Sequence, residues 1–285
     1  MKFASKRVQT LPPYVFSEFQ KKKKALESKG VDVIDLGIGA PDLPTPDFVV
    51  DRLVEEVRNP DNHRYSNYSG ILEYREAIAD FYKRQYDVEL DPETEVLALI
   101  GSKEGIANLI KAVVNENESV LVPNPGYPVY QSAIHMAGAK STPYDLVPHQ
   151  GFRPDFSSVA AEEYEAAKLM LVNYPSNPTA GTVELSTFME AVTLAKQHQF
   201  IIAQDAAYSL VTFDGYEAPS LLQVPDVKDV AVEFGSLSKS FNMTGWRIGY
   251  VVGNPEVIRA LSIVKNNMDT AQFIPIQKAG VEALQ

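Results

Sequence analysis

The chain has 285 residues, 45% of them hydrophobic, which is enough to bury a sizeable core in one large domain or two of ordinary size. Its formal net charge is -11, from 26 basic and 37 acidic residues, and no cluster of Lys or Arg alternates with aromatic residues, so we expect neither a nucleic acid nor a membrane surface as a partner. Cysteine is absent and the 4 histidines are scattered, which excludes disulfides and thiolate nucleophiles and predicts no metal site.

The N-terminal part of the chain differs in pattern from the rest. MKFASKRVQT lacks the apolar centre of a signal peptide, and the chain contains no run of about 18 apolar residues, so we expect a cytoplasmic protein. Residues 1–46 combine an arm containing LPPY, a helix that ends near Gly30 and the short run VIDLGIGAPD. The proline-rich segment 41–46 predicts a boundary, which divides the chain into residues 1–46 and 47–285.

After the boundary, helical periodicity and short apolar runs alternate. Helices are expected at residues 48–57, 71–86, 106–114, 127–137, 185–199 and 255–265. Strands are expected at residues 95–100, 119–123, 169–175, 200–205, 230–236 and 246–253. Apolar strands separated by amphipathic helices are typical of a mostly parallel sheet covered on both faces. The sequence therefore predicts a three-layer α/β/α fold with a mostly parallel mixed sheet.

Polar and glycine residues follow several of the predicted strands directly. In such a sheet, ligands bind at the carboxyl ends of the strands, where loops from several units converge. These strand ends carry Gly101-Ser102 and residues 173–177, 205–208 and 236–239. GSKEG, at residues 101–105, would expose backbone N–H groups at a helix N-terminus, which suits a phosphate but equally describes an ordinary tight turn.

Lys239 follows Ser236 and Ser238 and precedes Arg247 by eight residues. A lysine amine forms an imine with an aldehyde only when its pKa is depressed, because a solvated lysine, with a pKa of about 10.4, is mostly protonated. Arg247 and the serines could supply that environment and hold a phosphate. Taken alone, SLSK favours an ordinary loop lysine.

Four further residues could contact a cofactor ring, and two of them, Asp205 and Tyr127, have an ordinary structural interpretation as well. Asp205 could cap a following helix or could pair with a pyridinium nitrogen. Tyr208 and Asn177 could hydrogen-bond the phenolic oxygen of the same ring. Tyr127 could lie flat on that ring or belong to the core.

Five motifs in this order, GSKEG, VPNPGYP, NYPSNPT, DAAYS and SLSKSFNMTGWRIG, resemble a class I pyridoxal-phosphate aminotransferase of fold type I. The resemblance runs from about Leu11 to Gln285. LPPYVF, DLGIGAPDLPTPD, LIGSKEGIANL and EFGSLSKSFNMTGWRIGY are particularly similar to the LL-diaminopimelate aminotransferases. The resemblance implies amino-group transfer to 2-oxoglutarate from LL-diaminopimelate, or from aspartate, alanine or methionine, with pyridoxal phosphate as the cofactor. It also implies a homodimer. Residues 47–285 would form the large cofactor-binding domain, and residues 1–46 an arm and a small-domain segment.

The resemblance also assigns roles to single residues. Lys239 would bind the cofactor covalently and move the substrate's α-proton, and Asp205 would hold the pyridinium. The phenolic oxygen would be bound by Tyr208 and Asn177, and the ring would stack on Tyr127. The phosphate would be bound by the backbone amides of Ser102 and Lys103, by Ser236, Ser238 and Arg247, and by Tyr65 of a neighbouring subunit. Substrate contacts would come from Tyr14, Gly39 and Lys103.

Two features depart from the family pattern. NPTG is usual, whereas this chain reads Asn177-Pro178-Thr179-Ala180-Gly181, so alanine would be strained by about 1 kcal/mol if residue 180 is left-handed. The family's C-terminal small domain, with the arginine that binds the substrate carboxylate, is expected to be missing from residues 1–285. A cofactor-binding fragment without turnover is therefore one alternative.

Other enzyme classes explain the motifs less completely. Ser236 and Lys239 satisfy the S-x-x-K of penicillin-recognising hydrolases, but the K-T-G element of that class does not occur. Gly37 and Gly39 begin a dinucleotide-binding pattern that fails at Asp42. A pyridoxal-phosphate carbon-sulfur lyase would use nearly the same groups, and only its products distinguish it.

Overall fold

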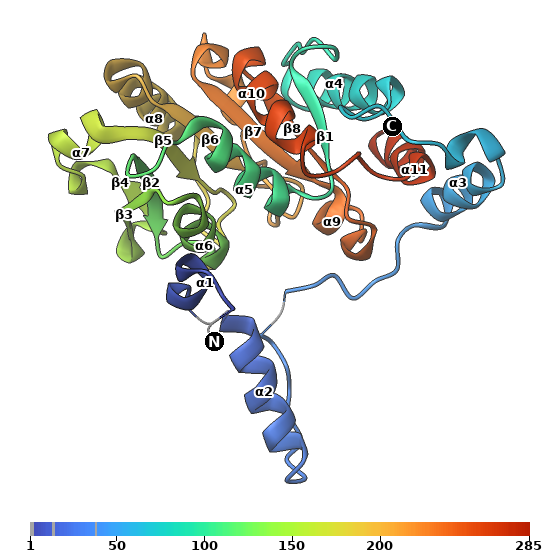
Figure 1. Cartoon of the computed structure of the whole chain (residues 1–285), viewed down its shortest axis with the longest axis horizontal. Coiled ribbons are helices and arrows are strands. Elements are labelled where there is room, and N and C mark those ends of the chain that lie inside the picture. The colour runs from blue at the N-terminus through green and yellow to red at the C-terminus, as the bar shows by residue number, and fades with distance from the viewer. Residues whose placement is uncertain (1–2, 13–14, 38) are drawn as a thin grey trace.

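A computed structural model describes residues 3–12, 15–37 and 39–285. Its centre is an eight-stranded sheet with the order β1-β8-β7-β6-β5-β2-β3-β4 (Figure 1). The strands are β1 Val96–Leu99, β2 Ser119–Asn124, β3 Lys140–Val147, β4 Arg153–Asp155, β5 Ala167–Val172, β6 Ile201–Asp205, β7 Ala231–Ser236 and β8 Gly249–Gly253.

The sheet is mixed, with a parallel centre. β3, β2, β5, β6 and β7 pair in parallel, whereas β1 with β8, β8 with β7 and β3 with β4 are antiparallel. The predicted mostly parallel mixed sheet is confirmed. Because β8 runs against both of its neighbours, β1 and β7 point the same way and their carboxyl ends lie at one edge.

Helices cover both faces, as the apolar strands require. The α-helices after residue 46 are α3 Asp47–Val57, α4 Leu72–Tyr86, α5 Ser102–Val113, α6 Pro128–Ala137, α7 Ala161–Ala166, α8 Leu185–His198, α9 Leu237–Ser240, α10 Pro255–Asn266 and α11 Ile274–Leu284. Short 3-10 turns lie at η1 Pro60–His63, η2 Pro148–Gln150, η3 Phe156–Ser158, η4 Leu221–Gln223, η5 Val227–Asp229 and η6 Thr244–Trp246.

The core consists of two clusters, one on each face of the sheet. In β1, Val96 and Ala98 pack into the cluster shared with α4, α8 and α11, whereas Leu97 and Leu99 pack into the cluster shared with α5, α6 and α10. This alternation follows from the period of two in a strand. Burial on both faces explains why the strands read as continuous apolar runs.

Several elements differ from the prediction. α5 begins at Ser102 rather than at residue 106, because Gly101 is its N-cap and GSKEG forms its first turn. β3 and β4 were not predicted: they form one end of the sheet, and the pattern of β3, KSTPYDLV, is polar and contains a proline. α7 and α11 were also missed. Tertiary packing rather than local pattern decides such elements.

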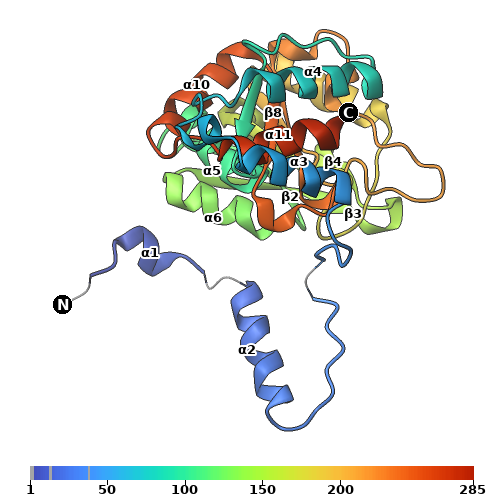
Figure 2. The same cartoon turned by 90° about the vertical axis from the view of Figure 1, so that its right-hand side faces the viewer.

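The N-terminal segment contains α1 Lys6–Thr10 and α2 Val15–Glu27. α1 lies against the end of α6, where Thr10 Oγ1 is 2.9 Å from His135 Nε2. α2 stands clear of the sheet and of the helices that cover it (Figure 2). The extended residues that follow lead to α3 and expose Ile34 and Leu36 by 84% and 91%. In the part of the chain that the structure describes, no helix is both long and apolar enough to span a membrane.

Candidate active site

One edge of the sheet brings together two of the motifs, GSKEG and SLSKSFNMTGWRIG. β1 pairs Leu99 with Gly249, and β7 pairs Ser236 with the same Gly249. Because β8 is antiparallel to both strands, the residues just before β8 lie beside the residues just after β1 and at the end of β7. Gly101 and Arg247 therefore meet, although 146 positions separate them in the numbering.

The guanidinium group of Arg247 packs directly on Gly101. A Cβ atom at position 101 would lie 2.3 Å from Nη2 of Arg247, and the φ of Gly101 is +102°, so only glycine fits there. Nη1 of Arg247 donates to Thr244 O at 2.9 Å. A Cβ at Gly249 would lie 3.3 Å from the backbone N of Ser102. The guanidinium group of Arg247 and the N-terminus of α5 thus lie side by side, and both attract anions.

Lys239 lies on the short helix α9, which follows β7 directly. The hydroxyl oxygen of Ser236 caps this helix by accepting from Ser238 N at 3.2 Å. Nζ of Lys239 donates to Gly39 O at 2.8 Å and lies 5.8 Å from the centroid of the Tyr208 ring. Burial, and secondarily the positive charge of Arg247, lower the pKa of Lys239. Both effects favour the neutral, nucleophilic amine.

Asp205 ends β6 and is 7% exposed. Its Oδ2 accepts a 2.8 Å hydrogen bond from the hydroxyl of Tyr130, while its Oδ1 is buried without a hydrogen-bond partner among the described residues. Burial raises the pKa of Asp205 to about 6, against the lowering effects of the Tyr130 hydroxyl and of the backbone N–H of Ala207. A turn, not a helix, follows Asp205, so it is no helix cap. A buried carboxyl with an open acceptor suits a cationic or N–H donor.

Aromatic and amide groups surround this carboxyl. Tyr208 shares a side-chain hydrogen bond with Asn177, and burial raises the pKa of its phenol. The ring of Tyr127 packs edge-on against Tyr130, with 5.6 Å between centroids. Nζ of Lys103 lies 6.0 Å from the centroid of the Tyr127 ring. These contacts link the start of α5 to the end of β6.

One predicted site residue, Tyr65, lies apart from this cluster. Tyr65 is 89% exposed, in the loop between η1 and α4. Tyr14 lies outside the described residues. Gly39 is brought to the site from the N-terminal segment through its carbonyl bond to Lys239. Ala180 has a φ of 55°, which is the left-handed conformation in which an alanine at this position is expected to be strained.

A family model described as "Aminotransferase class I and II" matches residues 31–285. The chain belongs to the class I and II aminotransferases. This aminotransferase is 48% identical over 280 residues to LL-diaminopimelate aminotransferase of Moorella thermoacetica, covering 98% of this chain and 72% of the relative. The same name, identity and coverage apply to the relative from Aquifex aeolicus.

Solved structures agree with this membership. The aminotransferase is similar to apo-BacF from Bacillus subtilis, with a TM-score of 0.95 and 38% identity over 100% of this chain and 72% of the other. A probable N-succinyldiaminopimelate aminotransferase from Thermus thermophilus superposes with a TM-score of 0.91 and 36% identity, covering 95% of this chain and 73% of the other. The predicted fold class and the predicted enzyme class are both confirmed.

Aminotransferases of this family generally depend on pyridoxal phosphate, and the residues present fit that group. The open Oδ1 of Asp205 suits a protonated ring nitrogen, and the guanidinium group of Arg247 beside the start of α5 suits a phosphate. Lys239 supplies an amine with a lowered pKa. Within the described ranges, no group of three or more His, Cys, Asp or Glu side chains is placed to hold a metal ion.

The sequence did not indicate a role for Tyr130 or Gln272. In the structure, the side chain of each hydrogen-bonds a part of the site. Tyr130 lies three residues after Tyr127 on one helix face, a spacing that could have indicated it. Gln272 precedes α11 and donates to Leu99 O and to Arg247 O. No local pattern identifies it.

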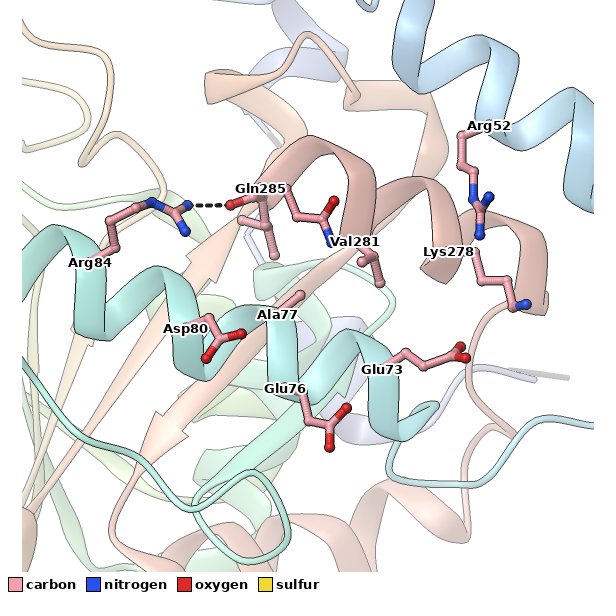
Figure 3. Close-up of a pocket in the computed structure, with 10 residues that line it drawn as sticks. Arg52, Glu73, Glu76, Ala77, Asp80, Arg84, Lys278, Val281 and Gln285 are labelled. Carbon is pink, nitrogen blue, oxygen red and sulfur yellow. Dashed lines mark hydrogen bonds between the residues drawn. The ribbon is translucent and has the colours of Figure 1, made fainter.

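A pocket of about 370 Å³ between α3, α4 and α11 lies apart from this chemistry (Figure 3). Two basic groups of its wall are paired within the protein, because Arg52 and Lys278 bind Glu56 at 2.7 Å and 3.1 Å. Arg84 donates to Leu284 O. None of the predicted site residues lines it, so we assign it no catalytic role.

Proposed function

We propose that this aminotransferase binds pyridoxal phosphate at Lys239 and transfers the amino group of LL-diaminopimelate to 2-oxoglutarate. The observation that carries the cofactor assignment is the open, buried Oδ1 of Asp205, on the same sheet edge as the lysine. The amino-acid preference rests on the relatives, because those named LL-diaminopimelate aminotransferase are up to 48% identical to this chain. Aspartate, alanine and methionine are the competing donors.

When bound, pyridoxal phosphate supplies an aldehyde that receives the amino group and a ring that accepts electrons. Asp205 would bind the ring nitrogen through Oδ1, since its Oδ2 is already occupied by Tyr130. Tyr208 and Asn177, which bond each other, would hold the phenolic oxygen. Tyr127 would cover the ring.

The phosphate would lie at the start of α5. The backbone N–H groups of Ser102 and Lys103 belong to the first turn of that helix, and a helix N-terminus is a favourable place for an anion. The other donors in the proposal are Ser236, Ser238 and Arg247. The positive end of the helix dipole and the guanidinium charge act on the same anion.

Lys239 would also move the proton of the substrate's α-carbon. Its Nζ is half-buried, and burial followed by the charge of Arg247 lowers its pKa, which favours the neutral amine that can accept this proton. Gly39 and Lys103 would contact the substrate, with Tyr14 added from the resemblance. Tyr65, which is exposed, would reach the phosphate of a neighbouring subunit in a homodimer. Residues 47–285 would form the cofactor-binding domain. The enzyme would be cytoplasmic.

The test measures amino transfer from LL-diaminopimelate to 2-oxoglutarate, with Lys239→Ala as the matched inactive variant. Wild-type protein loaded with pyridoxal phosphate should show a visible absorbance band that the variant lacks. A band of equal strength in the variant would contradict the lysine assignment. Release of pyruvate and ammonia in place of oxo acid exchange would indicate a carbon-sulfur lyase, and a band without turnover would indicate a cofactor-binding protein only.

A further inference from the structure

Gln272 lies in the segment between α10 and α11 and is 7% exposed. Its Nε2 donates to Leu99 O, at the end of β1, and to Arg247 O, just before β8, the second bond being 2.9 Å long. One side-chain amide therefore joins two segments that belong to different parts of the chain.

These two bonds continue the sheet beyond its last backbone pair. The β1–β8 pairing ends with Leu99 opposite Gly249, and Gln272 connects Leu99 to Arg247, two residues further along. Arg247 has φ of 55°, a left-handed conformation that costs a non-glycine residue about 1 kcal/mol. Such a residue keeps its conformation only when its surroundings hold it. Gln272 is one of those surrounding groups.

The two segments that Gln272 joins carry the two groups assigned to the phosphate, namely the N-terminus of α5 and the guanidinium group of Arg247. Leu99 leads within two residues to Gly101 and to the first N–H groups of α5. Arg247 carries the guanidinium group that packs on Gly101. A change in the distance between Leu99 and Arg247 would therefore change the distance between the guanidinium and the helix N-terminus.

Gln272 is itself held on both sides. Asp269 accepts from Ala271 N at 2.9 Å and pairs with Lys265, which is fully buried. On the other side, Gln277 Nε2 donates to Gln272 O at 2.8 Å. The amide orientation is also determined, because exchanging its N and O atoms would place an oxygen against two carbonyl oxygens.

The oxygen of this amide has no hydrogen-bond partner within the described part of the chain. A buried polar atom without a partner is unfavourable, so an apolar side chain of the same length would avoid that cost. Any advantage of glutamine over such an apolar side chain must therefore come from the two hydrogen bonds that its Nε2 donates.

We propose that Gln272 is a positioning residue for the phosphate end of the cofactor site, acting through Leu99 and Arg247. This inference rests on the proposed function, namely on pyridoxal phosphate binding with its phosphate between Arg247 and α5. The residue need not touch the cofactor. Its contribution should depend on the phosphate and not on the ring.

The experiment titrates the cofactor-free protein with pyridoxal phosphate and with pyridoxal, which has the same ring and aldehyde but no phosphate. Gln272→Met keeps the length and removes the donor. We expect its dissociation constant for pyridoxal phosphate to rise about tenfold, or about 1.4 kcal/mol, while that for pyridoxal stays within about twofold. In a double-mutant cycle with Arg247→Met, the two effects should be less than additive.

Asn254→Leu is the matched control. Nδ2 of Asn254 also bridges two carbonyl oxygens, those of Lys228 and Asp229 at 2.7 and 3.0 Å, but just beyond the opposite end of β8. It should lower stability without a phosphate-specific loss. If Gln272→Met does not fold, Gln272→Asn, whose amide is one methylene too short to bridge both carbonyls, takes its place.

The outcomes separate the two proposals. Equal losses for both ligands, or no loss for either, would overturn the role of Gln272. A wild-type protein that binds pyridoxal phosphate no better than pyridoxal would overturn the proposed phosphate site and, with it, this inference. A phosphate-specific loss in the Gln272 variant alone supports the proposal.

Discussion

The hydroxyl of Tyr130 donates to Oδ2 of the buried Asp205 at 2.8 Å, and Oδ1 of that carboxyl stays open within the described residues. Burial disfavours the carboxylate, whereas the hydrogen bonds from Tyr130 and from the backbone of Ala207 favour it, and the balance raises the pKa of Asp205 to about 6. The carboxyl is thus oriented by one oxygen and available through the other.

The first prediction concerns the stability of the cofactor-free protein. The pKa of Asp205 is higher in the folded chain than its ordinary value of 3.8, so its contribution is fully present below about pH 4 and is lost as the pH rises through about 6. The loss is about 3 kcal/mol. Asp205→Asn should remove this dependence, so its stability relative to wild type should rise between pH 4 and 7. Urea unfolding of both proteins across that range measures it, and a pH-independent difference would contradict the raised pKa.

Tyr130→Phe should raise the pKa of Asp205 further, because the variant removes the hydrogen bond that lowers it. More of the carboxyl is then protonated near neutrality, so cofactor binding should weaken at pH 6 to 7 and recover at higher pH. The pH dependence of the dissociation constant for pyridoxal phosphate measures the shift. Tyr127→Phe keeps the Tyr130 bond and should not move the curve.

Ala180→Gly should stabilise the protein. The φ of Ala180 is 55°, a conformation that glycine adopts without the steric cost of Cβ, so the gain should be about 1 kcal/mol. Denaturant unfolding checks it. Ala112→Gly, in α5, should change stability by a similar amount in the opposite direction, since glycine is unfavourable inside a helix. A destabilised Ala180→Gly protein would show that the alanine methyl makes contacts worth more than the strain.

Arg247→Met should raise the pKa of Lys239, because the positive charge of Arg247 is the second cause of its lowering, after burial. The amine of the cofactor-free variant should therefore become reactive only at higher pH than in wild type. Competitive acetylation followed by mass spectrometry reports the pH at which Lys239 reacts. Arg259→Met, which removes an exposed arginine paired with Glu256, should leave that pH unchanged.

The proposed dimer predicts complementation between two inactive variants. If Tyr65 serves the neighbouring subunit, mixing Lys239→Ala with Tyr65→Ala produces mixed dimers in which one site has both residues. Activity should then rise to as much as about a quarter of the wild-type value after random exchange of subunits. Mixing that yields only the average of the two separate activities would place Tyr65 in the site of its own chain.

The fold class and the motifs of the site could be predicted from local sequence patterns. Period-two and period-3.6 patterns are local, so apolar runs such as residues 200–205 and helices such as 71–86 could be predicted without the fold. Gly101 and the polar residues that follow the strands could be identified as site candidates for the same reason. Boundaries were less certain: α5 begins four residues early because Gly101 is its N-cap.

The way in which those motifs form one site depends on contacts between distant parts of the chain. Tyr130 reaches Asp205 across 75 residues, and Gln272 reaches Leu99 across 173. The antiparallel direction of β8, which brings Arg247 beside Gly101, also depends on pairing between distant strands. Contacts of this kind leave no periodic pattern, because they follow from the packing of elements whose separation in the chain is arbitrary.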